Sequence, residues 1–368
     1  MTPQRRRRDL KIIHTADIHL CMDMRHSSLS PDAAEAHRKQ IWRTFSSLIG
    51  EAKEQAADLL LIAGDLFETR CARSSDIKRA ADFFREIPDT RVLISCGNHD
   101  PLSRTSLYEG MEFPDNVTIF PTEMSMIEFP DLGVNVYGYS WERERYDSIP
   151  FDVPEPDRTM KNILVLHCDV TRRSEYMPVN VKMLSGIGFD YVALGHIHKP
   201  GAVRENICYP GSLEPLDFSE DGDHGYILVE EENGKFVPRF VPFASTRFVS
   251  AEVDITGIAD HSGLKEKVRS VLDAAPGDHV RLKLTGTKDP EMDLSFLGEE
   301  IKKDYRYLCV TDETRSDYDL IRLYRDNSDN IIGRFILELM NDAATDEKAR
   351  TALYCGLDAL LESGGGKR

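Results

Sequence analysis

The chain has 368 residues, of which 41% are hydrophobic and 30% are charged, and its formal net charge at pH 7 is −17. This composition is typical of a soluble globular protein with two or three domains, and the acidic charge counts against a general electrostatic attraction for nucleic acid. No run reaches the ~20 apolar residues that span a bilayer, and the N-terminus lacks the apolar region of a signal peptide, so we expect no membrane partner.

The seven cysteines are odd in number and include no CxxC pair. This argues against a disulfide framework or a zinc knuckle and indicates ordinary thiols, mostly buried, in a reducing cytoplasm. A polyanion would have to bind at local basic patches. The candidate patches are Arg5 to Arg8, Arg70 with Arg73, Arg143 with Arg145, and Arg172 with Arg173.

Strands and helices alternate over the first hundred residues. The run 59–63 is fully apolar, which indicates a strand buried on both faces, and Asp32 is placed to cap a long helix that follows it. This alternation predicts a parallel sheet covered by helices. The predicted elements are strand 10–16, helix 32–57, strand 59–63, helix 74–86 and strand 92–95.

The pattern then changes to short strands with one short helix near 181–184, and Asn233-Gly234 predicts a hairpin turn. The predicted strands are 117–120, 126–129, 134–139, 163–166, 191–194, 225–230 and 235–242. From about 246 a small α+β module is predicted, with strand 248–255, helix 262–272 and strand 280–285. From about 320 the pattern is helical, with Ile332, Phe335 and Leu339 on one side, and residues 363–368 should be disordered.

Five of the predicted strands end in side chains that can bind metal ions. Carboxylate, imidazole and amide are borderline-to-hard ligands suited to Mn²⁺, Fe²⁺ or Zn²⁺. In an extended segment residues i and i+2 point the same way, so a pair such as His196 and His198 could offer two ligands to one side. Asp65 is well placed by its order to bridge two ions, and a pair about 3.5–4 Å apart suits in-line displacement at phosphorus. The strand-end residues are Asp17, His19, Asp65, Asn98, His99, His167, His196 and His198.

These motifs resemble the signature of the calcineurin-like metallophosphoesterases over roughly residues 10–245. The resemblance implies a four-layer αββα sandwich of two mixed sheets, with a small α+β capping domain and a helical C-terminal tail. It also implies that one metal takes Asp17, His19, Asp65 and His198, and the other takes Asp65, Asn98, His167 and His196. His99 would face the scissile phosphate, with Asp100 orienting its ring.

Within this superfamily the chain is most similar to the SbcD/YhaO-type DNA repair nucleases. Residues 14–20 (HTADIHL), 64–67 (GDLF) and 209–217 (YPGSLEPLD) carry this resemblance, whereas protein phosphatases usually read Gly-Asp-x-x-Asp-Arg-Gly and Gly-Asn-His-Glu. Many relatives have His three residues after the bridging Asp, where this chain has Glu68. Cys21 also stands where glycine is more usual.

The resemblance implies a Mn²⁺-dependent phosphodiesterase, with exonuclease or endonuclease activity on DNA in DNA repair. It implies domains 1–245 (nuclease), 246–310 (capping) and 311–368 (helical), and an SbcC-like coiled-coil ATPase as partner. A homodimer is a further expectation. Two alternatives remain open: a phosphodiesterase for small nucleotides or other phosphoesters, and a non-catalytic scaffold for an ATPase. The apolar face with Phe335 and Leu339 is compatible with docking of this ATPase. Packing of the same face into a core fits the helical pattern at least as well.

Overall fold

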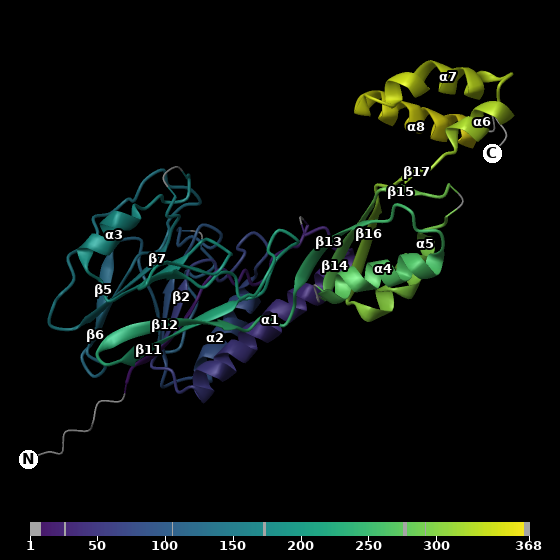
Figure 1. Cartoon of the computed structure of the whole chain (residues 1–368). Coiled ribbons are helices and arrows are strands. Elements are labelled where there is room, and N and C mark those ends of the chain that lie inside the picture. The colour runs from purple at the N-terminus through teal and green to yellow at the C-terminus, as the bar shows by residue number, and fades with distance from the viewer. Residues whose placement is uncertain are drawn as a thin grey trace, which may run out of the picture. The chain divides into compact units, whose positions relative to one another are not determined.

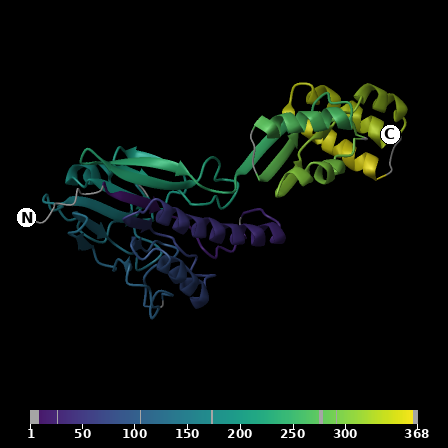
Figure 2. The same cartoon turned by 90° about the horizontal axis from the view of Figure 1, so that it is seen from below.

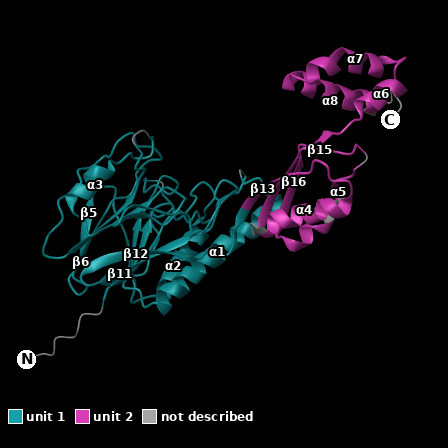
Figure 3. Cartoon of the chain, viewed as in Figure 1, with its two compact units in different colours: residues 1–248 teal, residues 249–368 magenta. Residues whose placement is uncertain are grey.

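The computed structural model describes residues 9–25, 27–104, 106–171, 174–274, 278–290 and 292–363. The chain forms two compact units, residues 1–248 and 249–368 (Figure 3). The second unit contains both the predicted capping domain and the predicted helical region, so the division into three domains stays a prediction. The patches at Arg5 to Arg8 and Arg172 with Arg173, and the predicted disorder over 364–368, lie outside the described residues.

Two six-stranded sheets form the first unit (Figure 1). In the first sheet β1, β2, β3 and β4 run parallel, and β11 pairs antiparallel with β1 and β12. Its strands, in spatial order, are β12 (Lys235–Pro242), β11 (Gly225–Glu232), β1 (Lys11–Thr15), β2 (Leu59–Ala63), β3 (Arg91–Ser95) and β4 (Val117–Ile119).

In the second sheet β6, β7, β8 and β10 run parallel, and both edge strands are antiparallel to their neighbours. In spatial order its strands are β5 (Ser125–Phe129), β6 (Val134–Gly138), β7 (Lys161–His167), β8 (Tyr191–Gly195), β10 (Ile207–Tyr209) and β9 (Gly201–Arg204). Both sheets are therefore mixed.

The layers are held together by three apolar clusters, because the central strands are apolar on both faces. Between the sheets, Leu61 of β2 belongs to the same buried cluster as Val165 of β7. On the outer face of the first sheet lie α1 (Pro31–Glu54) and α2 (Ser74–Arg85), side by side in both views (Figures 1 and 2). The outer face of the second sheet packs with α3 (Val181–Ile187). This order of layers confirms the αββα sandwich.

The start of α1 differs from the prediction. Ser30 is the N-cap residue, and its hydroxyl accepts a hydrogen bond from the Ala33 backbone N–H at 3.4 Å. Pro31 takes the first helical position, where its missing N–H costs nothing. Asp32 therefore lies inside the first turn, where its charge favours the helix dipole, and is not the cap.

The predicted hairpin at Asn233-Gly234 is confirmed. Glu232 of β11 pairs with Lys235 of β12, and the two residues between them have φ of 52° and 74°. Two successive residues with positive φ are typical of the two-residue turn that joins twisted strands.

The second unit begins with a three-stranded sheet in the order β13 (Phe248–Asp254), β14 (His279–Thr285) and β16 (Tyr307–Asp312). Residues of α4 (His261–Ala274) and α5 (Ser295–Glu300) complete its apolar cluster. This part of the chain also contains a short 3-10 helix (Lys302–Asp304). It also contains a two-stranded sheet of β15 (Thr287–Lys288) and β17 (Arg315–Ser316). The sequence did not predict β9 and β10, which have four and three residues, or β16, which is nowhere fully buried.

The helical region contains α6 (Leu320–Asp326), α7 (Ile331–Ala343) and α8 (Glu347–Glu362). Ile332 is fully buried in its cluster, and Phe335 and Leu339 pack against that cluster. The apolar face predicted from the sequence therefore serves the packing of these helices.

All seven cysteines are free thiols, as predicted. Only Cys96, Cys168 and Cys208 are buried, so the expectation that most would be buried was too strong. Within the described part of the chain, no helix combines the length and the apolar character that crossing a bilayer requires.

Candidate metal centre

The predicted site residues lie where strands of the two sheets end. β1, β2 and β3 deliver the first six, and β7 and β8 deliver the last three. The two edges meet, because His167 Nδ1 at the end of β7 is 2.9 Å from the Ala63 carbonyl oxygen at the end of β2. The nine residues are Asp17, His19, Asp65, Asn98, His99, Asp100, His167, His196 and His198.

The ligand atoms of six of these residues form three overlapping groups, and within each group all atoms lie within 4.8 Å of one another. The groups share members, because Asp17, His19 and Asp65 each belong to two of them. The groups are Asp17, His19 and His198; His19, Asp65 and His99; and Asp17, Asp65 and His167. This sharing makes the three groups parts of one continuous centre.

The closest approaches are between side chains from different sheets. His19 Nε2 and His198 Nε2 are 3.2 Å apart, and His198 Nε2 is 3.8 Å from Asp17 Oδ1. On the other side, His167 Nε2 is 3.3 Å from Asp65 Oδ2. Asp65 thus lies between the two sides, as its predicted bridging role requires.

Asn98 and His196 complete the second side. Asn98 Oδ1 is 2.9 Å from His167 Nε2, and the His196 ring lies 5.3 Å from the His167 ring. Tyr176, which the sequence did not point to, lies against the His196 ring with centroids 4.8 Å apart. Among the described carboxylate and imidazole side chains predicted as ligands, His196 alone belongs to none of the three groups.

The backbone of the candidate ligands is not extended. Asp17, His19 and Asp65 have φ near +50°, and His196 has φ of 105°. The prediction that neighbouring ligands share a side because the chain is extended was therefore wrong, although the residues do converge. These conformations are costly for residues other than glycine. Hydrogen bonds hold them: the Asp17 N–H donates to the Gly64 carbonyl at 3.1 Å, and the His19 N–H donates to the Asp65 carbonyl at 3.0 Å.

Two glycines give the side chains room to meet. A Cβ at Gly64, whose φ is +95°, would overlap the His167 ring, and a Cβ at Gly97 would overlap the Asp65 carboxylate. Both motif glycines are thus required by close approach.

Electrostatics and donor chemistry fit a pair of metal ions. Asp17 and Asp65 are buried at 0% and 1% exposure, and buried charges need a counter-charge or a metal. Burial raises the pKa of Asp17 to about 6. Burial would also raise the pKa of Asp65, but the neighbouring imidazoles of His167 and His19 lower it below its ordinary value. Oxygen and imidazole donors suit Mn²⁺, Fe²⁺ or Zn²⁺, and the ligand roles of the individual residues stay predictions.

His99 is oriented by Glu68, and the expectation for Asp100 was wrong. His99 Nδ1 is 2.7 Å from Glu68 Oε2. Asp100 is fully buried and accepts hydrogen bonds from four backbone N–H groups and the Tyr108 hydroxyl. Both oxygens of its carboxylate accept hydrogen bonds from the loops that follow β2 and β3, so the carboxylate is not available to orient the His99 ring.

A second carboxylate, that of Glu220, contacts His198. Nothing in the sequence indicated this residue. Glu220 Oε1 is 2.6 Å from His198 Nδ1, which leaves Nε2 facing the centre. The other oxygen, Oε2, accepts from the Ser212 hydroxyl at 2.8 Å and from the Leu216 N–H at 3.1 Å. A carboxylate that accepts from the outer nitrogen of a ligating histidine fixes its tautomer and raises its basicity.

Replacing Glu220 with alanine is expected to weaken one of the two metal sites about 10–100-fold. Titration of the metal-free protein with Mn²⁺ by calorimetry measures this as a change in one of two binding steps. Asp221→Ala removes the adjacent exposed carboxylate and should leave both steps unchanged. Equal affinities in Glu220→Ala and the wild type would show that the contact does not position His198.

Sequence signals for Glu68 and Glu220 were unequal. Glu68 stands three residues after Asp65 in the GDLFE stretch, so its place near the centre could be inferred, but not its partner. Glu220 lies 22 residues after His198 in a loop rich in acidic residues, and no spacing rule distinguishes it from Asp217, Asp221 or Asp223.

Comparison with known proteins agrees with the fold and the strand-end motifs. A model of the calcineurin-like phosphoesterase family matches residues 10–200. The uncharacterised metallophosphoesterase YhaO of Bacillus subtilis (strain 168) is 29% identical over 350 residues, covering 86% of this chain and 84% of the relative.

Two solved structures align with this chain over almost all of their own length. The protein TT1561 of Thermus thermophilus aligns with a TM-score of 0.38 and 14% identity, over 63% of this chain and 99% of its own. A dimetal phosphatase from Danio rerio aligns with a TM-score of 0.36 and 11% identity, over 64% and 99%. On the family match over more than half of its length, the chain belongs to the calcineurin-like phosphoesterases.

Proposed function

We propose that the chain is a two-metal phosphodiesterase of the SbcD nuclease type, acting on DNA in DNA repair. The observation that carries the phosphodiesterase part is the juxtaposition of a buried ligand cluster with a more accessible histidine. The His19 side chain is 1% exposed and that of Asp65 2%, whereas that of His99 is 42% exposed. A substrate can therefore touch His99, while His19 and Asp65 stay shielded from water.

The contact with Glu68 prepares His99 for proton transfer. Burial alone would lower the pKa of His99, but the hydrogen bond that the ring donates to Glu68 and the charge of Asp65 raise it above its ordinary value. The raised pKa favours the protonated ring, in which Nδ1 donates to Glu68 and Nε2 is left to donate to a substrate. Nε2 can stabilise charge on a phosphoryl oxygen or protonate the leaving oxygen.

Two bound divalent ions would act as Lewis acids on the phosphoryl group and lower the pKa of water. The residues proposed to hold them are Asp17, His19, Asp65 and His198 on one side, with Asp65, Asn98, His167 and His196 on the other. We propose Mn²⁺ as the ion, and Fe²⁺ and Zn²⁺ suit the same donors.

The proposal of DNA as substrate is supported by resemblance. The stretches 14–20, 64–67 and 209–217 are similar to the SbcD/YhaO type, and a separate α+β unit follows the catalytic one along the chain. Members of that type work with a coiled-coil ATPase, and we propose such a partner here. The side chains of Ile321 on α6 and of Ile331 and Leu337 on α7 are exposed and so are accessible to such a partner. Assembly into a homodimer is proposed on the same resemblance.

The test uses purified protein stripped with a chelator and reloaded with Mn²⁺. Labelled single-stranded and double-stranded DNA are incubated beside bis(4-nitrophenyl) phosphate. We expect hydrolysis of all three, with DNA cleavage falling steeply as salt is added while the small ester is unaffected. Asp65→Asn, which removes the charge of the bridging carboxylate, should lose activity on every substrate.

The same assay separates the alternatives. Hydrolysis of the small ester without any cleavage of DNA would favour a phosphodiesterase for small nucleotides. A protein that binds little metal and hydrolyses neither substrate would be a non-catalytic scaffold. The second outcome is disfavoured by the site itself, because a scaffold has no use for the Glu68–His99 contact.

A further inference from the structure

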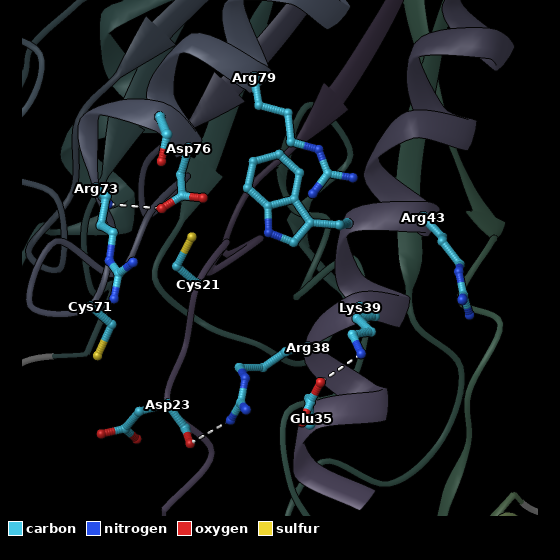
Figure 4. Close-up of a pocket in the computed structure, with 12 residues that line it drawn as sticks. Cys21, Asp23, Glu35, Arg38, Lys39, Arg43, Cys71, Arg73, Asp76 and Arg79 are labelled. Atoms are coloured by element: carbon cyan, nitrogen blue, oxygen red, sulfur yellow. Dashed lines mark hydrogen bonds and ion pairs between the residues drawn. The ribbon is translucent and has the colours of Figure 1, made fainter. Parts of the chain in front are cut away.

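An open groove between α1 and the start of α2 has an unusual balance of charge. Its volume is about 640 Å³, and Figure 4 draws the side chains that line it. Three acidic side chains face five basic ones, so the groove is net positive in a chain whose net charge is −17. The basic residues are Arg38, Lys39 and Arg43 of α1, with Arg73 and Arg79 on the α2 side.

The acidic side chains of the groove are already occupied. Glu35 pairs with Lys39 at 2.6 Å on the same helix. Asp23 pairs with Arg25, which does not line the groove, at 2.9 Å. The Asp76 carboxylate accepts from the Arg73 backbone N–H at 2.8 Å and so caps α2 (Figure 4).

The four arginines of the groove, in contrast, form no ion pair with a described carboxylate. Among the described residues, no carboxylate lies within ion-pair distance of them. Arg38 donates to the Asp23 backbone carbonyl oxygen at 3.2 Å, and Arg43 donates to the neutral Gln40 amide at 3.4 Å. The Arg79 guanidinium lies 4.2 Å from the centre of the Trp42 ring, which holds the group in place without neutralising it.

Two residues that line the groove are close in sequence to residues of the metal centre. Cys21, which lines it, is two residues after His19, so their Cα atoms are at most about 7 Å apart. Cys71, another lining residue, is three residues after Glu68, the partner of His99. The two sites nevertheless share no residue.

We propose that this arginine groove binds the phosphate groups of a nucleic-acid strand whose scissile phosphodiester lies at the metal centre. The inference rests on the proposed function and names the part of the surface that would distinguish a polymer from a small ester. Guanidinium groups form bidentate hydrogen bonds to phosphate. A small phosphodiester held at the metal centre would have no second phosphate to offer the groove, whereas a strand has one at every nucleotide.

The test measures binding and hydrolysis separately. The double variant Arg73→Gln/Arg79→Gln removes two charges from the groove, and Arg38→Gln/Arg43→Gln removes two from the α1 wall. The control Lys78→Gln/Arg85→Gln removes the same charge from α2 at exposed residues outside the groove. Each protein is loaded with Mn²⁺ and assayed with a long oligothymidylate and with bis(4-nitrophenyl) phosphate, and oligothymidylate binding is measured by fluorescence anisotropy in chelator.

Each groove variant should raise the KM and Kd for the oligothymidylate about 10-fold, with kcat and small-ester hydrolysis unchanged. The dependence of log Kd on log salt should become shallower by about 0.7 for each phosphate of a single strand that the variant no longer neutralises. The control should match the wild type.

Other outcomes have distinct meanings. Groove variants that bind and cleave the oligothymidylate as the control does would overturn the groove and leave the proposed function standing. Arginine-dependent binding without any hydrolysis by the wild type would overturn the proposed function and leave the groove standing. Equal losses on the polymer and the small ester would show that the arginines act through the metal centre or the fold, and would overturn the groove as a binding site. A wild type that binds no oligothymidylate would overturn it too.

Discussion

Replacing His99 with alanine is expected to lower kcat for phosphodiester hydrolysis by about 10²–10⁴-fold, the range typical of a lost general acid. The ring is the accessible member of the centre and is held by Glu68 at 2.7 Å, so its removal deletes a proton donor. Because His99 is not one of the proposed ligands, calorimetry and metal analysis should still find two bound ions. Turnover that survives the change would show that His99 has no part in the chemistry.

Glu68→Gln is the matched variant for this prediction. The amide keeps a hydrogen bond to the ring but loses the charge that raises the pKa of His99. A protonated His99 is present below its pKa and is lost as pH rises through that pKa. The decline of kcat on the alkaline side should therefore move to lower pH in Glu68→Gln, with a smaller loss of rate than in His99→Ala. An unmoved decline would separate Glu68 from the proton on His99.

Replacing Asp100 with alanine is expected to destabilise the protein by at least about 1–3 kcal/mol, the cost of leaving a buried hydrogen-bond donor unsatisfied. The carboxylate accepts from the N–H groups of Gly97 at 2.7 Å and Leu66 at 2.9 Å, and from the Tyr108 hydroxyl at 2.6 Å. Its loss would leave these buried donors without an acceptor. Urea unfolding, followed at a fixed metal concentration, measures the free-energy change.

The control for Asp100 is the exposed Asp89, for which an Ala substitution should change stability by no more than about 0.5 kcal/mol. If Asp100→Ala unfolds at the same urea concentration as the wild type and loses only kcat, the carboxylate has a catalytic role. That result would restore the original expectation that it orients His99.

The convergence of the site could be predicted because it follows from strand direction. Asp17, Asp65 and Asn98 follow strands that run parallel in one sheet, and parallel strands bring their carboxyl ends to the same edge. The motif resemblance supplied the second sheet, from which His167 and His198 come. Neither of these two inferences requires knowledge of the conformation of the loops.

What the sequence could not predict was the pairing of side chains within those loops. Asp100 directly follows His99, yet its carboxylate turns toward the backbone of residues 65–67, and Glu68 takes the ring instead. The choice depends on how two loops from different strands fit together, which no local pattern encodes. Positive φ at Asp17 and His19 escaped prediction for the same reason, since it is held by hydrogen bonds that their N–H groups donate to the neighbouring loop.

In the second unit, prediction was limited by short elements and by exposure. β16 is half-exposed along its length, so it lacks the alternation that marked β14. The helical face of Phe335 and Leu339 was recognised correctly, but periodicity alone cannot say whether such a face meets its own chain or another.

The candidate ligands are divided between the two sheets, and this division links catalysis to the mechanical integrity of the sandwich. Ions bound there would crosslink the layers from one edge, so the folded first unit would gain free energy with every increase in free metal, about 4 kcal/mol at a thousandfold excess over Kd. The same geometry makes the spacing of the ions depend on how closely the sheets are packed. Core substitutions such as Leu61→Ala, made in the apolar interior where no substrate reaches, would thereby alter the reaction.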